Sequence, residues 1–512
     1  MDAESESLSN KSITSAGESS ELGSSLAVDS SEPSSVDSTG ILEEKNISKA
    51  SKASSKKQSL PDEVLDAPLV HGGLWKAIWL MSWPLLISTV ATSIVGMVDV
   101  QVSSYLGSSS QAAVGLAEHI TFMFMIAIFS ISVGTTAIVS REFGEGNTAE
   151  TLRGTAQSLQ LSGICGTILA LLALTCSKYF LPLFSHSPEV VGVGSTYLSI
   201  FGFYLIPFSV VCITGAAFRA IGDARTGLII VLIDVVINII GDYLTVVKNW
   251  PVPGLGIRGI AFSGVVANLV AAVVAVFLIY RSPLKASLSQ VGKFDWDMQK
   301  RILRIGLPSA IQRSGWAGSV FAVFFILKHV PNATAALASW TIGMRVEGLL
   351  FMPMMAFSLA VSSIVGQNHG AKKEDRAMRA GWNVTGLACG LMAIFGALMF
   401  VGADQIASVM SQDPTTIKFT ASYLRINAIA EPFLAVAMVL MGALQGAGDT
   451  KMPMFFSLFC NSVVRLPLSW WLAITLNMGT DGVWIAMAIS VTVCAVLCTL
   501  RFRSGEWMKT KV

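Results

Sequence analysis

Apolar stretches in the first half of the chain contain polar side chains that could do chemistry, among them Asp99, Asp234, Asn238 and Asp242. An ionisable side chain inside a membrane is costly unless it is paired or wetted, so each is a candidate functional residue. The four-residue spacing of the last three places them on one helical face. Carboxylates held together in a low-dielectric site can share a proton, and hard cations such as Na⁺ prefer oxygen ligands. We therefore predict a coupling-ion site for H⁺ or Na⁺ at Asp99, Asn238 and Asp242, with Asp234 and Ser263 as additional members.

The depth of Asp99 and Asp242 supports this grouping. Asp99 precedes the turn at Gly107 by 8 residues, and Asp242 precedes Lys248 by 6. At about 1.5 Å per helical residue, both lie roughly 10 Å below the same membrane surface. The alternative is a structural role, in which Asp242 only accepts hydrogen bonds at a helix end.

The second half of the chain carries a different set of charges, Arg345, Glu347 and Glu431, and its first apolar segment contains Arg313 but no acid. Arg345 and Glu347 are two residues apart, so they point to different sides of a helix and each needs a partner elsewhere. Buried ion pairs that fix the packing are one interpretation of this set. A second protonation site at Glu431, beside Pro432, is the other.

Soft and aromatic side chains suggest a substrate cavity at Met123, Phe124, Met352 and Met355, since such surfaces adapt to varied ligands and attract organic cations. Packing against lipid explains the same residues. The sequence shows no phosphate-binding loop, zinc-ligand cluster or nucleophile with a base in reach. We therefore predict no enzymatic activity, no cofactor, no metal other than Na⁺ and no nucleic-acid partner.

The composition indicates the elements that must position these residues. Of 512 residues, 53% are hydrophobic and 13% charged, with a mean hydropathy of +0.63, which is outside the usual range of soluble proteins. A membrane-spanning helix needs about 20 mostly apolar residues. Twelve segments meet this requirement: 77–106, 112–140, 156–177, 191–217, 226–247, 256–280, 302–328, 334–365, 381–402, 417–444, 453–475 and 480–502.

The basic residues predict the orientation of these spans. Lys and Arg flanking the spans number 20 on one side and 5 on the other, which places both termini in the cytoplasm. Residues 1–70 contain 19 serines and 13 acids, so we expect a disordered cytoplasmic tail there. The expected domains are this tail, an N-lobe at 71–280, a cytoplasmic linker at 281–301, a C-lobe at 302–503 and a short cytoplasmic tail at 504–512.

An internal repeat divides the spans into two sets of six. Tyr197 and Tyr423 begin similar stretches, and Gly222-Asp223 corresponds to Gly448-Asp449, at the same offset of 226 residues. Because six is even, both copies cross the membrane in the same direction. We expect two bundles facing each other, whose rocking gives alternating access to a central site.

Five further motifs occur in a specific order: Pro84 and Asp99; Arg141-Glu-Phe-Gly-Glu-Gly; Arg219-Ala-Ile-Gly-Asp followed by Asn238 and Asp242; Gly366-Gln-Asn-His-Gly-Ala-Lys; and Gln445-Gly-Ala-Gly-Asp-Thr-Lys. Over residues 75–503 this order resembles the multidrug and toxic compound extrusion (MATE) family. The acid in the first span and the Asn and Asp in the fifth resemble the coupling site of its DinF-like branch. The chain departs from other branches at Arg313, where they carry an acid, and in its serine-rich tail.

The resemblance implies an all-α fold of 12 transmembrane helices in two pseudo-symmetric six-helix bundles, arranged as V-shaped lobes. It implies a monomeric exporter of organic, often cationic or amphipathic, compounds, driven by antiport with H⁺ or Na⁺ in the bilayer of the plasma membrane. Two alternatives remain open from the sequence. One is a flippase for lipid-linked precursors, which needs a lateral opening and a cationic cavity, and the other is a receptor or scaffold that transports nothing.

Overall fold

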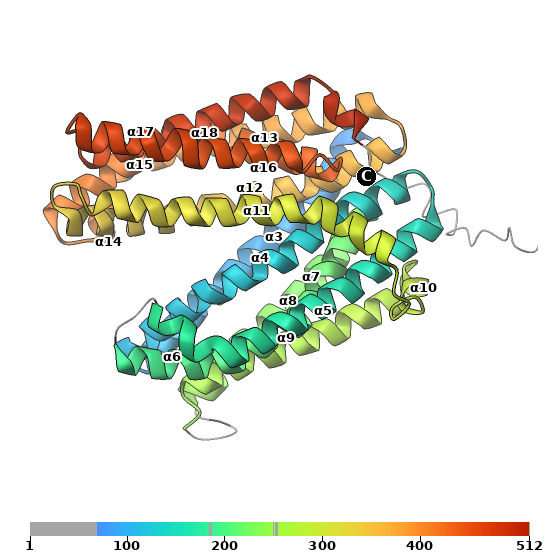
Figure 1. The fold of residues 1–512 in the computed structure, drawn as a ribbon, viewed down its shortest axis with the longest axis horizontal. Coiled ribbons are helices and arrows are strands. Elements are labelled where there is room, and N and C mark those ends of the chain that lie inside the picture. Colours follow the sequence, from blue (N-terminus) through green and yellow to red (C-terminus); the bar gives the residue numbers. More distant parts are fainter. Residues whose placement is uncertain (1–68, 184–186, 249, 251–253, 511–512) are drawn as a thin grey trace, which may run out of the picture. The chain divides into compact units, whose positions relative to one another are not determined.

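The computed structural model describes residues 69–183, 187–248, 250 and 254–510, all within one compact unit. The regular structure of these residues is entirely helical, which confirms the all-α prediction (Figure 1). Eleven of the described helices are long and apolar enough to cross a membrane. The predicted tail, apart from Leu69 and Val70, lies outside the described residues.

The first six predicted spans form the N-lobe. The fourth span is divided by a short 3-10 turn at Gly202–Tyr204, and the fifth continues beyond its α-helix as a π-helical turn at Tyr243–Val247. The helices of the N-lobe are α3 (Leu74–Ser104), α4 (Ser108–Gly144), α5 (Thr148–Phe180), α6 (Pro188–Phe201), α7 (Leu205–Ala220), α8 (Ala224–Asp242) and α9 (Ile257–Tyr280).

The other six predicted spans form the C-lobe, which follows a connector containing the short helix α10 (Lys285–Leu288). The helices of the C-lobe are α11 (Trp296–Leu327), α12 (Ala333–Gly370), α13 (Glu374–Val401), α14 (Ala403–Met410), α15 (Pro414–Gly446), α16 (Lys451–Leu458), α17 (Leu466–Trp470) and α18 (Thr480–Arg503). The ends that carry the loops after α4, α7, α9, α12 and α15 are called the basic end below, and the opposite ends the far end.

The span predicted at 453–475 is interrupted, so the structure has eleven long helices rather than twelve. Two π-helical stretches, Phe459–Arg465 and Trp471–Thr475, alternate with α16 and α17. Pro467 lacks the N–H that an α-helix requires at this position. Arg465 reaches sideways from the π-helical turn, and its Nε donates to Ser490 Oγ of α18 at 3.0 Å.

The internal repeat is visible where α4 and α12 cross at the basic end. A Cβ added to Gly144 would overlap the carbonyl oxygen of Gln367, and one added to Gly370 would overlap the carbonyl oxygen of Arg141. Arg141 and Gln367, like Gly144 and Gly370, are equivalent positions of the repeat. The two lobes therefore meet through a symmetric pair of glycine contacts that admit no side chain.

The first helix of each lobe also packs against the other lobe near the basic end. Ala77, Ile78 and Met81 of α3 belong to a buried cluster formed mostly by α12, α13 and α15. In the same way, Met298 and Ile302 of α11 belong to a cluster formed mostly by α4, α5 and α7. The buried core of each lobe therefore includes the basic-end half of the first helix of the other lobe.

The connector between the lobes is fixed to α5. Gln157 Nε2 donates to the carbonyl of Lys293 at 2.6 Å, and the N–H of Asp295 donates to Gln157 Oε1 at 3.2 Å. The Asp295 carboxylate pairs with Arg153 and also accepts from the N–H of Met298, which caps the start of α11. The cap and the ion pair together anchor α11 to the N-lobe.

Asp295→Ala is expected to lower the free energy of unfolding by about 1 kcal/mol at neutral pH, because it removes an N-cap. The Arg153 guanidinium holds the pKa of the Asp295 carboxyl below its usual range. Stabilisation by a group with a lowered pKa is present above the unfolded-state pKa of about 3.9 and is lost as pH falls through the folded-state pKa. Denaturant unfolding of both proteins should therefore give curves that converge on acidification. Asp297→Ala, which leaves the cap intact, is the control; an equal loss there would refute the assignment.

Candidate functional site

Three of the predicted site residues come together between α3, α8 and α9. Asp242 is fully buried at the last position of α8. Ser263 of α9 donates a hydrogen bond from its Oγ to Asp242 Oδ1. The carboxyl of Asp99, on α3 and 8% exposed, lies within hydrogen-bonding range of the Asp242 side chain. Two carboxyl groups and a hydroxyl thus form one buried polar group, called the N-lobe site below.

The side-chain pattern of α8 explains why its acids face inward. Ile229, Leu232, Val236 and Ile240 form an exposed apolar stripe along one side of the helix. Residues spaced by four from Asp242 lie away from this stripe. The stripe is suited to contact lipid, and the helix then turns its polar residues toward α3 and α9.

Glycines let α8 and α9 approach closely at this site. A Cβ on Gly241 would lie 2.6 Å from the Cβ of Ser263, and a Cβ on Gly259 would lie 2.8 Å from the Cβ of Thr245. Both distances are too short for carbon atoms that are not bonded. Ser263 therefore reaches Asp242 only because residue 241 has no side chain.

Gly241→Ala is expected to separate Ser263 from Asp242 and to weaken the predicted ion-coupled transport roughly tenfold, since the added methyl forces α9 outward. The measurement is initial transport rate against ion concentration in proteoliposomes. Gly227→Ala is the matched control because a Cβ at this position of α8 meets no atom within 4 Å. Equal rates for the two variants would show that the α8–α9 contact does not hold the site.

Asn238 lies one turn before Asp242, beside Gly264 of α9. It is 6% exposed, and its Oδ1 has no hydrogen-bond partner among the described residues. A buried amide oxygen without a donor is poorly satisfied. Asn238 therefore offers a free oxygen ligand close to the N-lobe site.

Asp234 belongs to a second polar pair one further turn away. Its Oδ1 accepts from Asn268 Nδ2 of α9 at 3.0 Å, so it does not join Asp99 and Asp242 directly. Tyr204 lies within electrostatic range of both Asp234 and Asp99. Asn268 and Tyr204 are not among the residues predicted from the sequence, although Asn268 is the one amide in the apolar run 256–280.

The donor set of the N-lobe site suits a small cation. Carboxylate, amide and hydroxyl oxygens are hard ligands for cations. Two adjacent carboxylates repel each other in a buried site, so either one of them is protonated or a metal cation binds between them. The described residues therefore fit either H⁺ or Na⁺.

Both lobes of the chain match the model of one protein family. A family model described as MatE matches residues 84–244 and 308–471, more than half of the chain. The chain belongs to the MatE family. This result confirms the predicted resemblance, and the matched segments contain Asp99, Asn238 and Asp242.

Individual relatives agree with the family assignment. The probable multidrug resistance protein NorM of Thermotoga maritima is 26% identical over 461 residues, covering 89% of this chain and 97% of the relative. A protein of the same name from Acinetobacter baylyi is 26% identical over 434 residues, covering 83% and 95%. A structure described as the outward-facing conformation of a multidrug resistance MATE family transporter has a TM-score of 0.81 at 21% identity, covering 87% and 99%. The chain is therefore a multi-pass membrane transporter with the two-lobe MATE fold.

The C-lobe of this MatE protein contains its own buried polar cluster. The partly exposed Glu347 of α12 lies within electrostatic range of Tyr423 of α15 and of Arg465. Glu431 is 2% exposed and within electrostatic range of Glu347. Arg345 is exposed. The partners of Glu347 thus come from other helices.

The residues predicted for a substrate cavity have side chains that the rest of the protein does not fully cover. Met123 is 42% exposed on α4, and Phe124 is partly exposed beside it. On α12, Met352 and Met355 are partly exposed, whereas Met354 between them is buried. Their common membership of one cavity remains a prediction.

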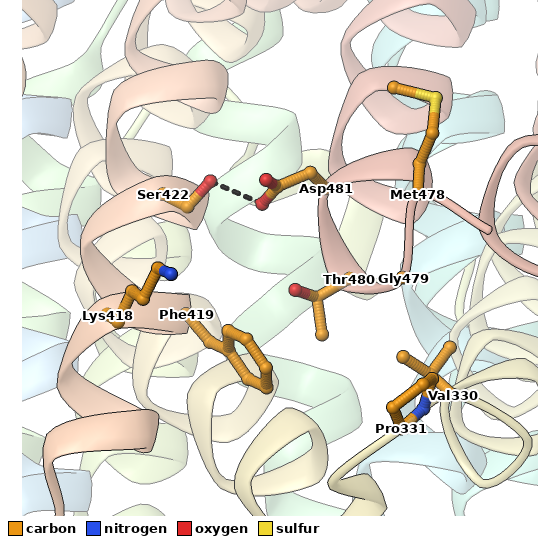
Figure 2. A pocket seen from close by; sticks show the side chains of 9 residues that line it. All are labelled: Val330, Pro331, Lys418, Phe419, Ser422, Met478, Gly479, Thr480 and Asp481. Carbon is orange, nitrogen blue, oxygen red and sulfur yellow. Dashed lines mark hydrogen bonds between the residues drawn. The ribbon is translucent and has the colours of Figure 1, made fainter.

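A separate pocket of about 160 Å³ opens at the far end of the C-lobe. Figure 2 shows Ser422 of α15 facing Asp481 of α18, and Ser422 Oγ donates to Asp481 Oδ1 at 2.5 Å. Lys418 and Phe419 line the same pocket. None of the predicted site residues lies there, so this pocket is distinct from the N-lobe site.

Proposed function

We propose that this MatE protein is a secondary active efflux transporter that exchanges organic amphipathic compounds for H⁺ or Na⁺ entering at the N-lobe site. The observation that carries the proposal is the buried contact of Asp99, Asp242 and Ser263. The names of the relatives, multidrug resistance proteins, support export of organic compounds. The excess of basic residues at the basic end supports a cytoplasmic location for it and for both termini.

Helix α3 can couple the ion to a movement of the lobes. It carries Asp99 in its far-end half, and its basic-end half packs against the C-lobe. Binding of a cation between Asp99 and Asp242 removes their mutual repulsion and favours the arrangement in which α3 and α8 are close. The difference in ion affinity between the two states of the transporter supplies the work of export.

The described contacts between the lobes support an outward-facing state of the exporter. The glycine contacts of Gly144 and Gly370 hold the basic end together. Gln367 Nε2 also donates to the carbonyl of Ala220 across the lobes at 2.6 Å. For the transporter to open to the cytoplasm, these contacts must separate.

Reconstituted full-length protein tests the proposal. A fluorescent organic compound is loaded into proteoliposomes, and a pH gradient or a Na⁺ gradient is imposed separately. We expect efflux with one of the two gradients and none when both are absent. Equal flux with and without gradients would contradict coupled antiport, and the absence of any flux of amphipathic probes would favour lipid flipping or a non-transporting role.

A further inference from the structure

Two arginines inside the lobes have no acidic partner among the described residues. Arg219 lies in the last turn of α7, in the N-lobe, and Arg313 lies near the middle of α11, in the C-lobe. Neither takes part in an ion pair within the part of the chain that the structure describes. A charged group within a membrane protein usually pairs with an opposite charge or faces a wet cavity.

The side chains of both arginines lie within electrostatic range of one residue of α7, Cys212. Arg219 folds back along α7, so that a Cβ on Gly215 would lie 3.1 Å from its Nη1, and its buried Nε donates to no described acceptor. Both guanidinium groups lie within electrostatic range of the Cys212 thiol, and Ser132 of α4 lies near the same thiol. Two positive charges from opposite lobes therefore flank one region between α4, α7 and α11.

Aromatic rings adjoin this region on the N-lobe side. The Arg313 guanidinium carbon lies 5.6 Å from the ring centroid of Phe129, which meets Phe208 edge-on at 5.7 Å. Phe208 stacks on Tyr204 at 5.4 Å, and Tyr204 stacks on Phe201 at 4.6 Å. This row of rings offers flat apolar contact next to the two cations.

The side chains around this region are not fully covered by the protein. Arg219, Arg313, Cys212, Phe129 and Phe208 all remain partly exposed, although they lie within the span of the lobes. A planar guanidinium binds carboxylate oxygens in pairs, and an aromatic surface holds an apolar body. The same charges repel an organic cation, which is the substrate class that the family resemblance implied.

We propose that Arg219 and Arg313 form the charged part of a substrate site for aromatic or amphipathic carboxylates, with the apolar body of the substrate against Phe129 and Phe208. The inference rests on the proposed transport function, whose cargo it specifies. Because one arginine belongs to each lobe, a bound carboxylate contacts both lobes and must lose one contact when they separate.

Equilibrium binding tests the site without any ion gradient. The purified full-length protein is titrated in chloride-free buffer with 2-naphthoate, with the neutral 2-naphthamide and with benzyltrimethylammonium. We expect naphthoate to bind at least tenfold more tightly than the other two. Arg313→Gln and Arg219→Gln should each weaken naphthoate binding at least tenfold. Arg425→Gln is the matched control, because Arg425 is paired with Asp404 elsewhere in the C-lobe.

Several results would overturn the inference. One is equal affinity for the acid and the amide. Another is displacement of naphthoate by phosphatidylglycerol, which would assign the arginines to a lipid headgroup. The third is a site that binds chloride but not naphthoate. Arg313→Lys and Arg219→Lys keep the charge but lose the paired donors, so they should fold and bind with intermediate affinity. Should a Gln variant elute as aggregate, the Lys variants decide the outcome.

Transport against a membrane potential separates this inference from the proposed function. Export of an anion in exchange for an entering cation moves charge in one direction, so an inside-negative potential should accelerate it, whereas one-for-one exchange of two cations is indifferent to potential. Asp99→Asn should retain naphthoate binding. If naphthoate binds through the arginines but no gradient drives flux, the carboxylate site stands and the antiport proposal fails.

Discussion

Asp99→Asn is expected to reduce ion-driven efflux by a factor of roughly 5 to 150 while leaving the abundance of the protein in the membrane unchanged. The amide keeps the shape of the carboxyl but carries no charge in any state. The cation then loses the opposing charge that makes its affinity differ between the two states of the transporter, and a coupling free energy of about 1–3 kcal/mol corresponds to a factor of roughly 5 to 150.

The measurement is initial efflux rate per reconstituted molecule with each ion gradient. Asp404→Asn is the control, because this exposed acid lies on α14 of the C-lobe and pairs with Arg425, far in sequence from Asp99. Transport by Asp99→Asn at the wild-type rate would remove the N-lobe site from the mechanism. An equal loss in Asp404→Asn would show that the effect is not specific to the site.

Gly144→Val is expected to shift the equilibrium of the transporter away from the state described here. The valine side chain cannot fit where the Cβ already overlaps the Gln367 carbonyl, so the contact between α4 and α12 must open. Overpacking of this kind costs about 1–3 kcal/mol, which corresponds to a five- to 150-fold change in the ratio of the two states. Because Gly370 occupies the equivalent place in the repeat, Gly370→Val should produce the same shift.

Spin labels placed on the loops of the basic end give the distance distribution between the lobes. Both variants should populate longer distances and transport more slowly. Gly163→Val is the control, since a Cβ there on α5 meets no atom within 4 Å. Unchanged distances in both glycine variants would mean that the basic end does not separate at this contact.

The membrane-spanning helices could be predicted from the sequence because length and apolar composition are local properties. The predicted ends of 480–502 and 256–280 differ from α18 and α9 by no more than a residue. The interruption after α16 coincides with Pro467, which is visible in the sequence, and with the hydrogen bond from Arg465 to Ser490 on a different helix, which is not.

The site was only partly predictable for the same reason. Helical spacing predicts that Asp234, Asn238 and Asp242 share one face of α8, but spacing cannot show which helix packs opposite each turn. Asp234 accepts a hydrogen bond from Asn268 of α9 and is therefore not part of the group formed by Asp99 and Asp242. From the sequence, Arg219 counts among the residues that flank the spans, because it lies at the end of α7. The sequence does not show that its side chain folds back along the helix toward Gly215.

The exchange of half-helices between the lobes has a consequence for biosynthesis. The buried cluster that contains Ala77, Ile78 and Met81 is completed by residues of α13, α15 and α18. When the ribosome has finished α9, the C-lobe residues that pack against the apolar face of α3 have therefore not yet been made. The nascent N-lobe remains incomplete in the translocon or the lipid until nearly the whole chain has been synthesised. Chain termination between the lobes should leave a fragment that quality-control proteases remove, whereas two half-chains synthesised together should rescue each other.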